Sequence, residues 1–316
     1  MGYYGTCERY IYTGLMVEGL NKTVTGKIIK GIAGVYSVNT DDSKVYLCKA
    51  KGTFRKEGIK PVIGDNVTID IISEADMEGN IIDIQNRKNR LIRPCVSNID
   101  QALIVVAMKN PEPSLLMLDK LILHFLEQNI PIILCFNKED IAGKDLSIEY
   151  EEIYKNSGIK TVVTSASLNR GTLELKALIK GMTTCIAGPS GVGKSTIINS
   201  LQDNVYMQTG DISNKLKRGR HTTRHSEIIP VSEGTYIIDT PGFTSLDVFN
   251  ITYDELKDYY EEFKPYDGCF FTPCSHIHEP KCKVREALSE GLISKVRYDN
   301  YCHIYEDLKN KSTIYK

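Results

Sequence analysis

The chain has 316 residues, with 39 lysine and arginine side chains against 40 aspartate and glutamate side chains, and a formal net charge of −1. This length allows two or three domains with buried cores, and the balanced charge excludes a generic polyelectrolyte binder while it permits local basic faces. No apolar run approaches the roughly 18 residues of a membrane helix, no signal-peptide pattern begins the chain, and the cysteines do not indicate a disulfide framework, so we expect a cytoplasmic protein without membrane contact.

Residues 1–21 fit neither a core element nor a targeting peptide. We expect them to form a leader outside the folded domains, either non-native or disordered, with Met16 as a candidate start. Residues 22–90 then show short alternating apolar patterns, separated by turns rich in Gly, Asp and Asn. Five strands, expected at 24–29, 34–38, 44–48, 66–72 and 80–84, predict a closed β-barrel of the oligonucleotide-binding (OB) type.

The predicted barrel is basic in a chain that is nearly neutral. Residues 22–93 contain 13 lysine and arginine residues against 9 aspartate and glutamate residues. With Tyr36, Tyr46 and Phe54 available to stack on bases, the segment is typical of an RNA-binding surface. The alternative is a solvated barrel face whose aromatic rings belong to the core.

Residues 91–248 are predicted to form a second domain of the α/β class. The nearly continuous apolar run at 101–108 is typical of a parallel strand covered on both faces, and residues 113–128 have the spacing of an amphipathic helix. Strand and helix patterns alternate onward to residue 247, which predicts a doubly wound sheet.

A polar loop of the form N-K-x-D follows the apolar run at 130–136. The carboxylate of Asp140 can accept hydrogen bonds from guanine N1–H and from the exocyclic amino group, whereas adenine would leave this charge facing the wrong edge. We expect Lys138 to pack over the base and Asn137 to tie the loop to a phosphate-binding loop, with Glu139 completing the motif. The alternative is a polar turn after a strand.

The strand pattern at 159–163 ends in a turn at 164–166, which consists of Thr164, Ser165 and Ala166. This turn is similar to the second base-contacting turn of guanine-nucleotide proteins. A helical pattern at 173–180 follows it. In a domain whose original two ends have been joined and which has been opened elsewhere, this helix would be the segment that joins them.

The strongest motif has the form G-x-x-x-x-G-K-S and lies between a strand pattern at 183–187 and a helical pattern at 195–201. Its glycines allow backbone N–H groups to face the β- and γ-phosphates, Lys194 adds a positive charge, and the Ser195 hydroxyl is a ligand for Mg²⁺. A glycine-rich turn that matches by chance is the alternative, but the flanking patterns favour a nucleotide site. The loop consists of Gly188, Pro189, Ser190, Gly191, Val192, Gly193, Lys194, Ser195 and Thr196.

The residues after this loop have the features of a hydrolase. We expect Asp239 to hold Mg²⁺ through a water, and the N–H of Gly242 to contact the γ-phosphate. Either Thr222 or Thr223, in a basic segment, is expected to join the Mg²⁺ shell. The residue after Gly242 is Phe243, whose apolar ring cannot orient a water, so we expect slow hydrolysis without a partner.

Three cysteines and a histidine with the spacing of a structural zinc site lie near the end of the chain. The thiols are Cys269, Cys274 and Cys282, and the spacing alone leaves His276 and His278 both open as the nitrogen ligand. Unrelated buried cysteines are the alternative. Against it, three of the nine cysteines fall within fourteen residues, which favours a metal site.

Residues 249–316 are expected to form a mainly helical domain around this cluster. Helical patterns are expected at 254–263 and again at 287–308. The expected packing face of the second pattern consists of Val284, Leu288, Leu292, Val296 and Tyr301.

The order of the motifs is unusual, because the base-reading loop comes before the phosphate-binding loop instead of after it. A circular permutation keeps every strand in its place if the old ends are joined and a new opening is made in a loop. On these motifs, the chain from about residue 22 onward resembles the circularly permuted GTPases of the RsgA/YjeQ family. The implied fold has an OB-type barrel, a circularly permuted α/β P-loop GTPase domain and a mainly helical zinc-binding module.

The resemblance also implies a function. It implies a monomeric GTPase that binds the small ribosomal subunit and its rRNA, hydrolyses GTP to GDP and phosphate, and is released late in assembly. The implied cofactors are GTP or GDP, Mg²⁺ and one structural Zn²⁺ with His276 as its nitrogen ligand. His221 would orient the attacking water, with contact to rRNA or solvent as the alternative. The alternative function is a GTP-regulated RNA-binding protein that acts on another RNA or receptor.

Overall fold

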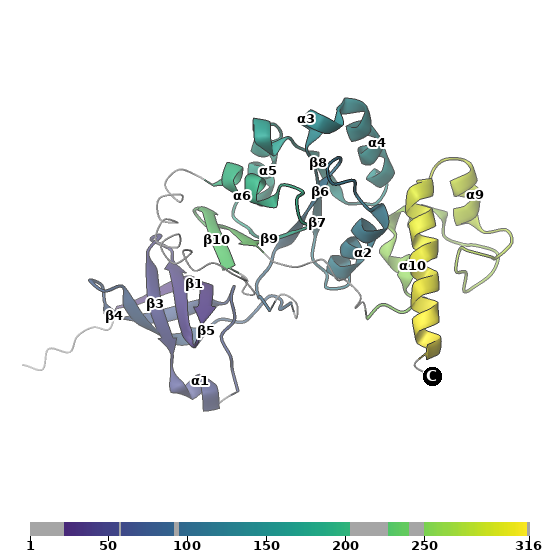
Figure 1. Ribbon diagram of the computed structural model, residues 1–316. Helices are drawn as coiled ribbons and strands as arrows, with labels where there is room; N and C mark the ends of the chain where they lie inside the picture. The colour runs from purple at the N-terminus through teal and green to yellow at the C-terminus, as the bar shows by residue number, and fades with distance from the viewer. Residues whose placement is uncertain (1–21, 57, 92–94, 203–226, 240–249, 315–316) are drawn as a thin grey trace, which may run out of the picture.

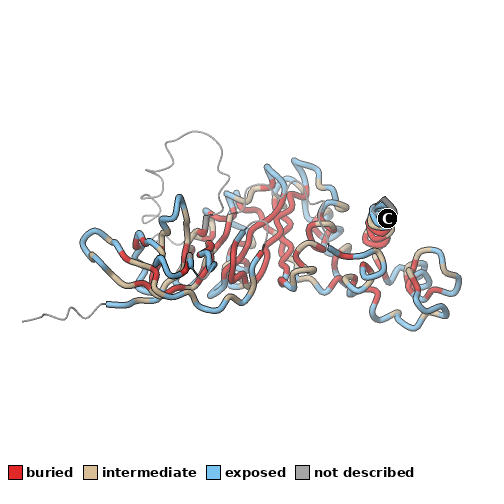
Figure 2. Tube along the Cα trace, turned by 90° about the horizontal axis from the view of Figure 1, so that it is seen from below, coloured by how far each residue is buried: buried red, intermediate tan, exposed pale blue. Residues whose placement is uncertain are grey.

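The computed structural model describes residues 22–56, 58–91, 95–202, 227–239 and 250–314. Three parts follow one another along the chain: a β-barrel, a central sheet covered by helices, and a mainly helical C-terminal module of residues 250–314 (Figure 1). Buried residues are concentrated in the strands through the middle of the molecule (Figure 2). Among the described residues, no helix is both long enough and apolar enough to cross a bilayer.

The barrel closes because five strands pair all the way round, in the order β1-β2-β3-β5-β4, with β4 paired to β1. The closed barrel predicted from the sequence is confirmed. Side chains alternate along the strands, so that Ile28, Val38 and Ile69 point inward and are buried. The elements are β1 (Thr23–Ile32), β2 (Val35–Thr40), β3 (Val45–Ala50), α1 (Gly52–Lys56), β4 (Asn66–Ser73) and β5 (Glu78–Ile84).

Two of the three aromatic side chains expected to stack on bases belong to the barrel core. Tyr46 is 2% exposed and Phe54 is also buried, so the prediction that they stack is wrong. The physical reason is the two-residue period of β3, which turns Tyr46 and Cys48 to the inner face together. Tyr36 on β2 is half-buried.

The central sheet has the strand order β10-β11-β9-β6-β7-β8, and every neighbouring pair is parallel except β10 with β11. All residues of β6, β7 and β9 are buried, as expected when both faces are covered. The chain runs from β6 outward to β8, crosses back to β9 and ends at β11, so the loops after β6 and β9 meet at a topological switch point. The strands are β6 (Gln101–Ala107), β7 (Ile132–Asn137), β8 (Lys160–Val163), β9 (Thr183–Ala187), β10 (Glu227–Ser232) and β11 (Thr235–Asp239).

Helices cover both faces of this sheet (Figure 1). One buried cluster includes Phe125 of α2 and Tyr154 of α4, and the other includes Leu175 of α5 and Ile197 of α6. Helix α5 carries the chain from the edge strand β8 to β9, the position expected for the joining segment of a permuted domain. The helices are α2 (Leu115–Leu126), α3 (Glu139–Ala142), α4 (Lys144–Tyr154), η1 (Ala166–Leu168), α5 (Thr172–Ile179) and α6 (Lys194–Leu201).

The C-terminal module is mainly helical, but both predicted helices are interrupted. Two short 3₁₀-helices replace the first, because Tyr260 between them has an extended backbone (φ −104°, ψ 91°) and a fully buried ring. The second divides at Gly291 (φ 75°), a left-handed residue that ends α9. This break buries Ile293 and exposes Leu292, so the assignment of Leu292 to the packing face is wrong. The elements are η2 (Leu256–Tyr259), η3 (Glu261–Tyr266), α9 (Lys283–Ser289) and α10 (Lys295–Ile314).

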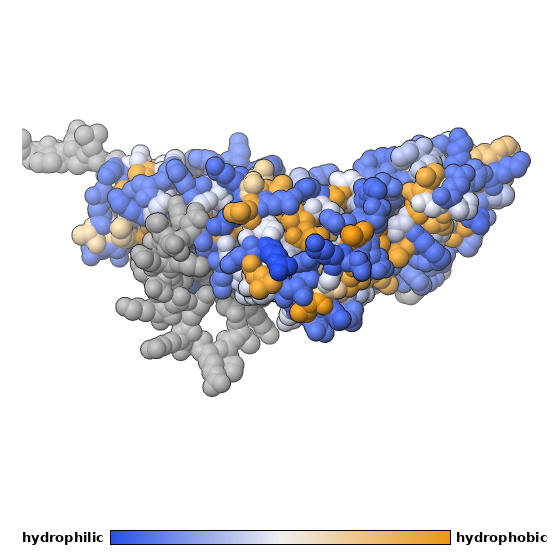
Figure 3. Space-filling view, turned by 90° about the horizontal axis from the view of Figure 1, so that it is seen from above, coloured by the Kyte–Doolittle hydropathy of each residue, from blue (hydrophilic) through white to orange (hydrophobic). Residues whose placement is uncertain are grey.

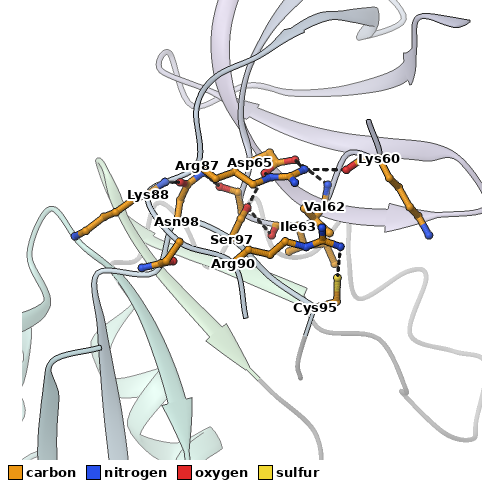
Figure 4. A network of polar contacts seen from close by, with 12 residues as sticks. Lys60, Val62, Ile63, Asp65, Arg87, Lys88, Arg90, Cys95, Ser97 and Asn98 are labelled. Atoms are coloured by element: carbon orange, nitrogen blue, oxygen red, sulfur yellow. Dashed lines mark hydrogen bonds and ion pairs between the residues drawn. The ribbon is translucent and has the colours of Figure 1, made fainter. Parts of the chain in front are cut away.

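The segment between β5 and β6, which includes Arg87 and Ser97, is tied to the barrel by the buried carboxylate of Asp65 (Figure 4). This carboxylate accepts hydrogen bonds from Arg87 Nε (2.6 Å), Ser97 Oγ (2.7 Å) and the N–H of Val62 (2.8 Å). Beside it, a Cβ on Gly64 would stand 2.1 Å from the carbonyl oxygen of Ser97. Glycine at this position therefore lets the two segments touch.

Candidate functional site

The phosphate-binding loop turns sharply between β9 and α6, and Gly188 (φ 137°) and Gly193 (φ 98°) have conformations that favour glycine. A Cβ on Gly188 would stand 2.2 Å from the carbonyl oxygen of Val105, and a Cβ on Gly193 2.4 Å from Asn137 Nδ2. A larger residue at either position would push the loop off its neighbours. The exposed residues around the turn are Pro189, Ser190, Gly191, Ser195 and Thr196.

Two opposite charges lie at this loop, one on its own Lys194 and one on Asp239 of the neighbouring strand. Lys194 Nζ donates hydrogen bonds to the carbonyl oxygens of Gly188 (2.8 Å) and Pro189 (2.7 Å). Burial lowers the pKa of Lys194, and the carboxylate of Asp239 opposes this shift. Asp239 ends β11 beside Ile186 of β9, directly before the loop. An ammonium and a carboxylate so placed are what a triphosphate with Mg²⁺ requires.

Asn137 joins the base-reading loop to the phosphate-binding loop. Its buried Nδ2 donates to the carbonyl oxygen of Val192 at 2.9 Å. Its Oδ1 accepts hydrogen bonds from the N–H of Ala166 (3.1 Å) and from Thr164 Oγ1 (3.0 Å). One side-chain amide thus connects the loops that follow β7, β8 and β9. Thr164 belongs to the predicted turn at 164–166, but it was not among the residues expected to bind the nucleotide.

Lys138 makes a second connection around the same site. Its backbone is left-handed (φ 68°), and its Nζ donates to the carbonyl oxygens of Gly191 (2.7 Å) and Asn110. Asn110 lies in the loop after β6, which sequence reasoning missed. The signal that could have found it is positional, because this loop follows the carboxyl end of the strand beside β9.

The carboxylate of Asp140 is exposed and held by two hydroxyl groups. Ser165 Oγ donates to Oδ1 (2.6 Å) and Ser167 Oγ to Oδ2 (3.3 Å). The hydrogen bond from Ser165 lowers the pKa of Asp140, so the group is ionised at neutral pH. Each carboxylate oxygen has a further lone pair for an N–H donor of a base. Glu139 points to Arg170 instead, in an ion pair of 3.1 Å.

The predicted nucleotide-site residues divide into two groups. His221, Thr222, Thr223 and Gly242 lie outside the residues that the structure describes, as does Phe243. The others lie at the carboxyl ends of β7, β8, β9 and β11, along one edge of the sheet. Asn137 sits between the base-reading and phosphate-binding loops, so the described part of the site can surround a single nucleotide.

A separate cluster of three thiols and one imidazole lies in the C-terminal module. The ligand atoms of Cys269, Cys274, His276 and Cys282 all lie within 4.8 Å of one another. The Sγ atoms of Cys269 and Cys282 are 3.8 Å apart, and His276 Nδ1 is 3.4 Å from Cys282 Sγ. Tetrahedral Zn²⁺ with ordinary bond lengths needs ligand separations of about 3.5–3.8 Å, so the cluster fits this ion. His278 is exposed and lies outside the cluster.

The surroundings of the cluster fix its geometry. Burial raises the pKa of the Cys274 thiol to about 12, so thiolates here need a bound cation. The carboxylate of Glu279 accepts hydrogen bonds from the N–H groups of Ser275 (2.7 Å) and Ile277 (3.2 Å), on either side of His276. Sequence reasoning missed Glu279, whose signal is an acidic residue three positions after the histidine.

Family models match the chain over most of its length. The model described as RsgA GTPase matches residues 84–249, and that of the RsgA N-terminal domain matches residues 25–81. A protein of Agathobacter rectalis named small ribosomal subunit biogenesis GTPase RsgA is 51% identical over 299 residues, covering 91% of this chain and 99% of that protein. A protein of Caldanaerobacter subterraneus with the same name is 42% identical over 289 residues, covering 91% and 97%.

Two solved structures are similar over nearly the whole chain. YjeQ from Thermotoga maritima has a TM-score of 0.74 at 33% identity, covering 91% of this chain and 99% of that one. YloQ, described as a circularly permuted GTPase, has a TM-score of 0.73 at 32% identity, covering 93% and 98%. The barrel, the permuted sheet and the C-terminal module are therefore shared as one arrangement.

Proposed function

Because this chain belongs to the RsgA family of GTPases, we propose that it binds the small ribosomal subunit and hydrolyses GTP there to GDP and phosphate. Its release from the subunit, late in maturation, would be linked to this hydrolysis. The observation that carries the proposal is the 2.9 Å hydrogen bond from Asn137 to Val192. It supports one shared site for the Asp140 carboxylate and the Lys194 ammonium. The names of the relatives supply the partner.

Guanine selection is proposed to come from Asp140. Its carboxylate is ionised and faces outward, with Ser165 and Ser167 fixing its orientation. Guanine offers two N–H donors to such a group, and adenine does not. Lys138, braced by the carbonyl oxygens of Asn110 and Gly191, keeps its aliphatic stem beside the base.

Hydrolysis is proposed to depend on positioned charge. Backbone N–H groups of the phosphate-binding loop and the Lys194 ammonium would hold the β- and γ-phosphates. The Ser195 hydroxyl and the Asp239 carboxylate would hold Mg²⁺, which supplies charge neutralisation at the transferred phosphoryl group. Thr222 or Thr223 would complete this shell, Gly242 would contact the γ-phosphate, and His221 would orient the water that Phe243 cannot.

Zinc is proposed to have a structural role only. Cys269, Cys274, His276 and Cys282 would occupy all four tetrahedral positions, which leaves none for a substrate. The bound ion would hold the C-terminal module in its folded state.

We assign residues 22–90 to an RNA-binding barrel, 91–248 to the GTPase domain and 249–316 to the zinc-binding module. The barrel's outward lysines, such as Lys49, suit phosphate contacts with rRNA in the cytoplasm. The protein would act as a monomer, with one copy on each subunit.

The test is phosphate release from GTP, measured with and without purified small ribosomal subunits. Alone, the protein should turn over slowly, on the order of 10⁻⁴ to 10⁻³ per second, as unassisted small GTPases do. Small subunits should raise this rate greatly, and Lys194→Ala should abolish it. Stimulation by large subunits to the same extent, or fast turnover without any subunit, would contradict the proposal and favour another RNA or receptor.

A further inference from the structure

The C-terminal module exposes two aromatic rings next to each other. Phe270 is 70% exposed and Phe271 is 44% exposed, and their ring centres lie 5.0 Å apart at 78°. Within the described part of the chain, every other phenylalanine and tyrosine ring is buried or half-buried, and the sequence contains no tryptophan. Figure 3 shows hydrophobic surface at the tip of this module, the end of the molecule farthest from the barrel.

These rings are held in place. Phe270 follows Cys269 directly, and the loop that carries both rings is closed by Cys274 of the same metal cluster. Zinc bound to these four ligands would fix both ends of the loop and keep the rings from folding inward. A preorganised apolar surface binds a partner at a small entropic cost, because little ordering remains to be done.

The surroundings of the rings are cationic. Lys281 Nζ lies 5.0 Å from the centre of the Phe270 ring, and Lys283 Nζ lies 3.6 Å from where a Cβ on Gly268 would stand. Residues 264–285 contain four basic and two acidic side chains. Both acidic side chains accept backbone N–H groups of their own loop: Asp267 from Gly268, and Glu279 from Ser275, Ile277 and His278.

From this combination we propose that Phe270, Phe271, Lys281 and Lys283 form a stacking platform for an unpaired nucleotide of RNA. The proposal rests on the proposed function and names the contact by which the module holds the small subunit. A base offers an aromatic face to the rings, and its phosphate offers negative charge to the lysines. The barrel cannot supply this contact from Tyr46 or Phe54, which lie in its core.

The test compares variants of the full-length protein for binding to purified small ribosomal subunits, with the non-hydrolysable GTP analogue present. Replacing both rings by alanine should weaken binding by roughly tenfold or more, as loss of base stacking does. Tyrosine at both positions should retain binding, because it also stacks. Leucine at both positions should fail as alanine does, because it fills a pocket but has no aromatic face.

The lysines provide an independent measurement. In Lys281→Gln/Lys283→Gln, the slope of log affinity against log salt should decrease by about one to two, because up to two phosphate contacts are lost. For the ring variants, Leu173→Ala is the control, because it removes an apolar side chain that is 81% exposed on the GTPase domain. Bound zinc and basal GTP hydrolysis are measured in every variant to show that the fold is intact.

The possible results separate the two proposals. If the wild-type protein binds small subunits and the alanine variant binds equally well, the stacking platform is overturned and the proposed function stands. If leucine restores binding that alanine loses, the rings fill a protein pocket and the RNA assignment is overturned. If the wild-type protein does not bind small subunits at all, both proposals are overturned.

Discussion

The barrel meets the central sheet along β10 and β11, whereas the C-terminal module meets it across α2 and α4 (Figure 1). Between the barrel and the strands β10 and β11 the described polar contacts are few, although the Asp65 carboxylate also ties the barrel to the segment that precedes β6. Asn39 Nδ2 donates to the hydroxyl of Tyr236 (3.0 Å), and Lys27 Nζ lies 5.5 Å from the centre of the same ring. Burial lowers the pKa of Lys27 at this contact.

The C-terminal side is joined by a buried ion cluster. Arg297 of α10 donates to Asp119 of α2 and to Glu262 Oε1 of η3, the latter at 2.8 Å. Asp119 also accepts hydrogen bonds from Asn300 (2.7 Å) and from the hydroxyl of Tyr154 (3.1 Å). Burial raises the pKa of Asp119, although Arg297 beside it opposes the shift.

The difference concerns how each flank can respond to nucleotide. Removing one partner of a buried ion pair costs about 3–5 kcal/mol, while an ordinary hydrogen bond contributes about 1 kcal/mol. The module is therefore fixed to α2 and α4 by a buried ion cluster, whereas the barrel contacts β11, the strand that ends in Asp239, through the hydrogen bond from Asn39 and the ammonium of Lys27. We therefore expect a change near the phosphates to alter the contact of the barrel with β11 more readily than the contact of the C-terminal module with α2 and α4.

The largest effect is expected when the metal is removed from the C-terminal module. Structural zinc sites contribute on the order of 10 kcal/mol to small zinc domains. We expect Cys282→Ser to lose its bound zinc and to make the C-terminal module sensitive to protease. GTP binding should persist, because Asn137 holds the nucleotide loops elsewhere. Elemental analysis and limited proteolysis measure both effects.

Cys302→Ser is the control for this variant. Cys302 lies on α10, is half-buried and does not belong to the metal cluster. It should retain about one zinc per chain. An unchanged zinc content in Cys282→Ser would refute the ligand assignment.

The next largest effect is expected at the ion cluster. Arg297→Met leaves the carboxyl groups of Asp119 and Glu262 buried without a cation. We expect a loss of about 3–5 kcal/mol in the free energy of unfolding, measured by urea denaturation. Lys295→Met on the same helix is the control, because its partner Asp299 and its own 78% exposed side chain lie in solvent. Equal effects of the two substitutions would mean that the module is not fixed by this cluster.

Much of the fold could be predicted from the sequence, because local patterns carry it. The nearly continuous apolar run at 101–108 indicated a covered parallel strand, and the structure has β6 at 101–107 with every residue buried. The permuted order followed from motif spacing, and the likeness to YloQ agrees with it. Where the pattern was wrong, a single residue overrode the helix period: the extended Tyr260 and the left-handed Gly291.

The site was predictable where a motif carries its own chemistry. The motifs that contain Asn137 and Gly193 predicted which loops bind the nucleotide. The contact of Lys138 with Asn110 could not be predicted in this way, because it depends on the order of the strands in the sheet. The inward turn of Tyr46 was hidden for a similar reason. Alternation assigns a side chain to one of two faces, and only barrel closure decides which face is the interior.

The smallest effect is expected at the contact between the barrel and β11. Asn39→Ala removes the hydrogen bond to Tyr236, and Tyr236→Phe removes the same bond from the other side. Each should cost about 1 kcal/mol or less, and the double variant should cost little more than either, since both delete one interaction. Urea denaturation of the four proteins gives the coupling energy. The coupling energy is then compared between GTP analogue and GDP. A difference means that the barrel contact responds to the phosphates through β11, and a constant coupling energy means that this contact does not respond to the nucleotide.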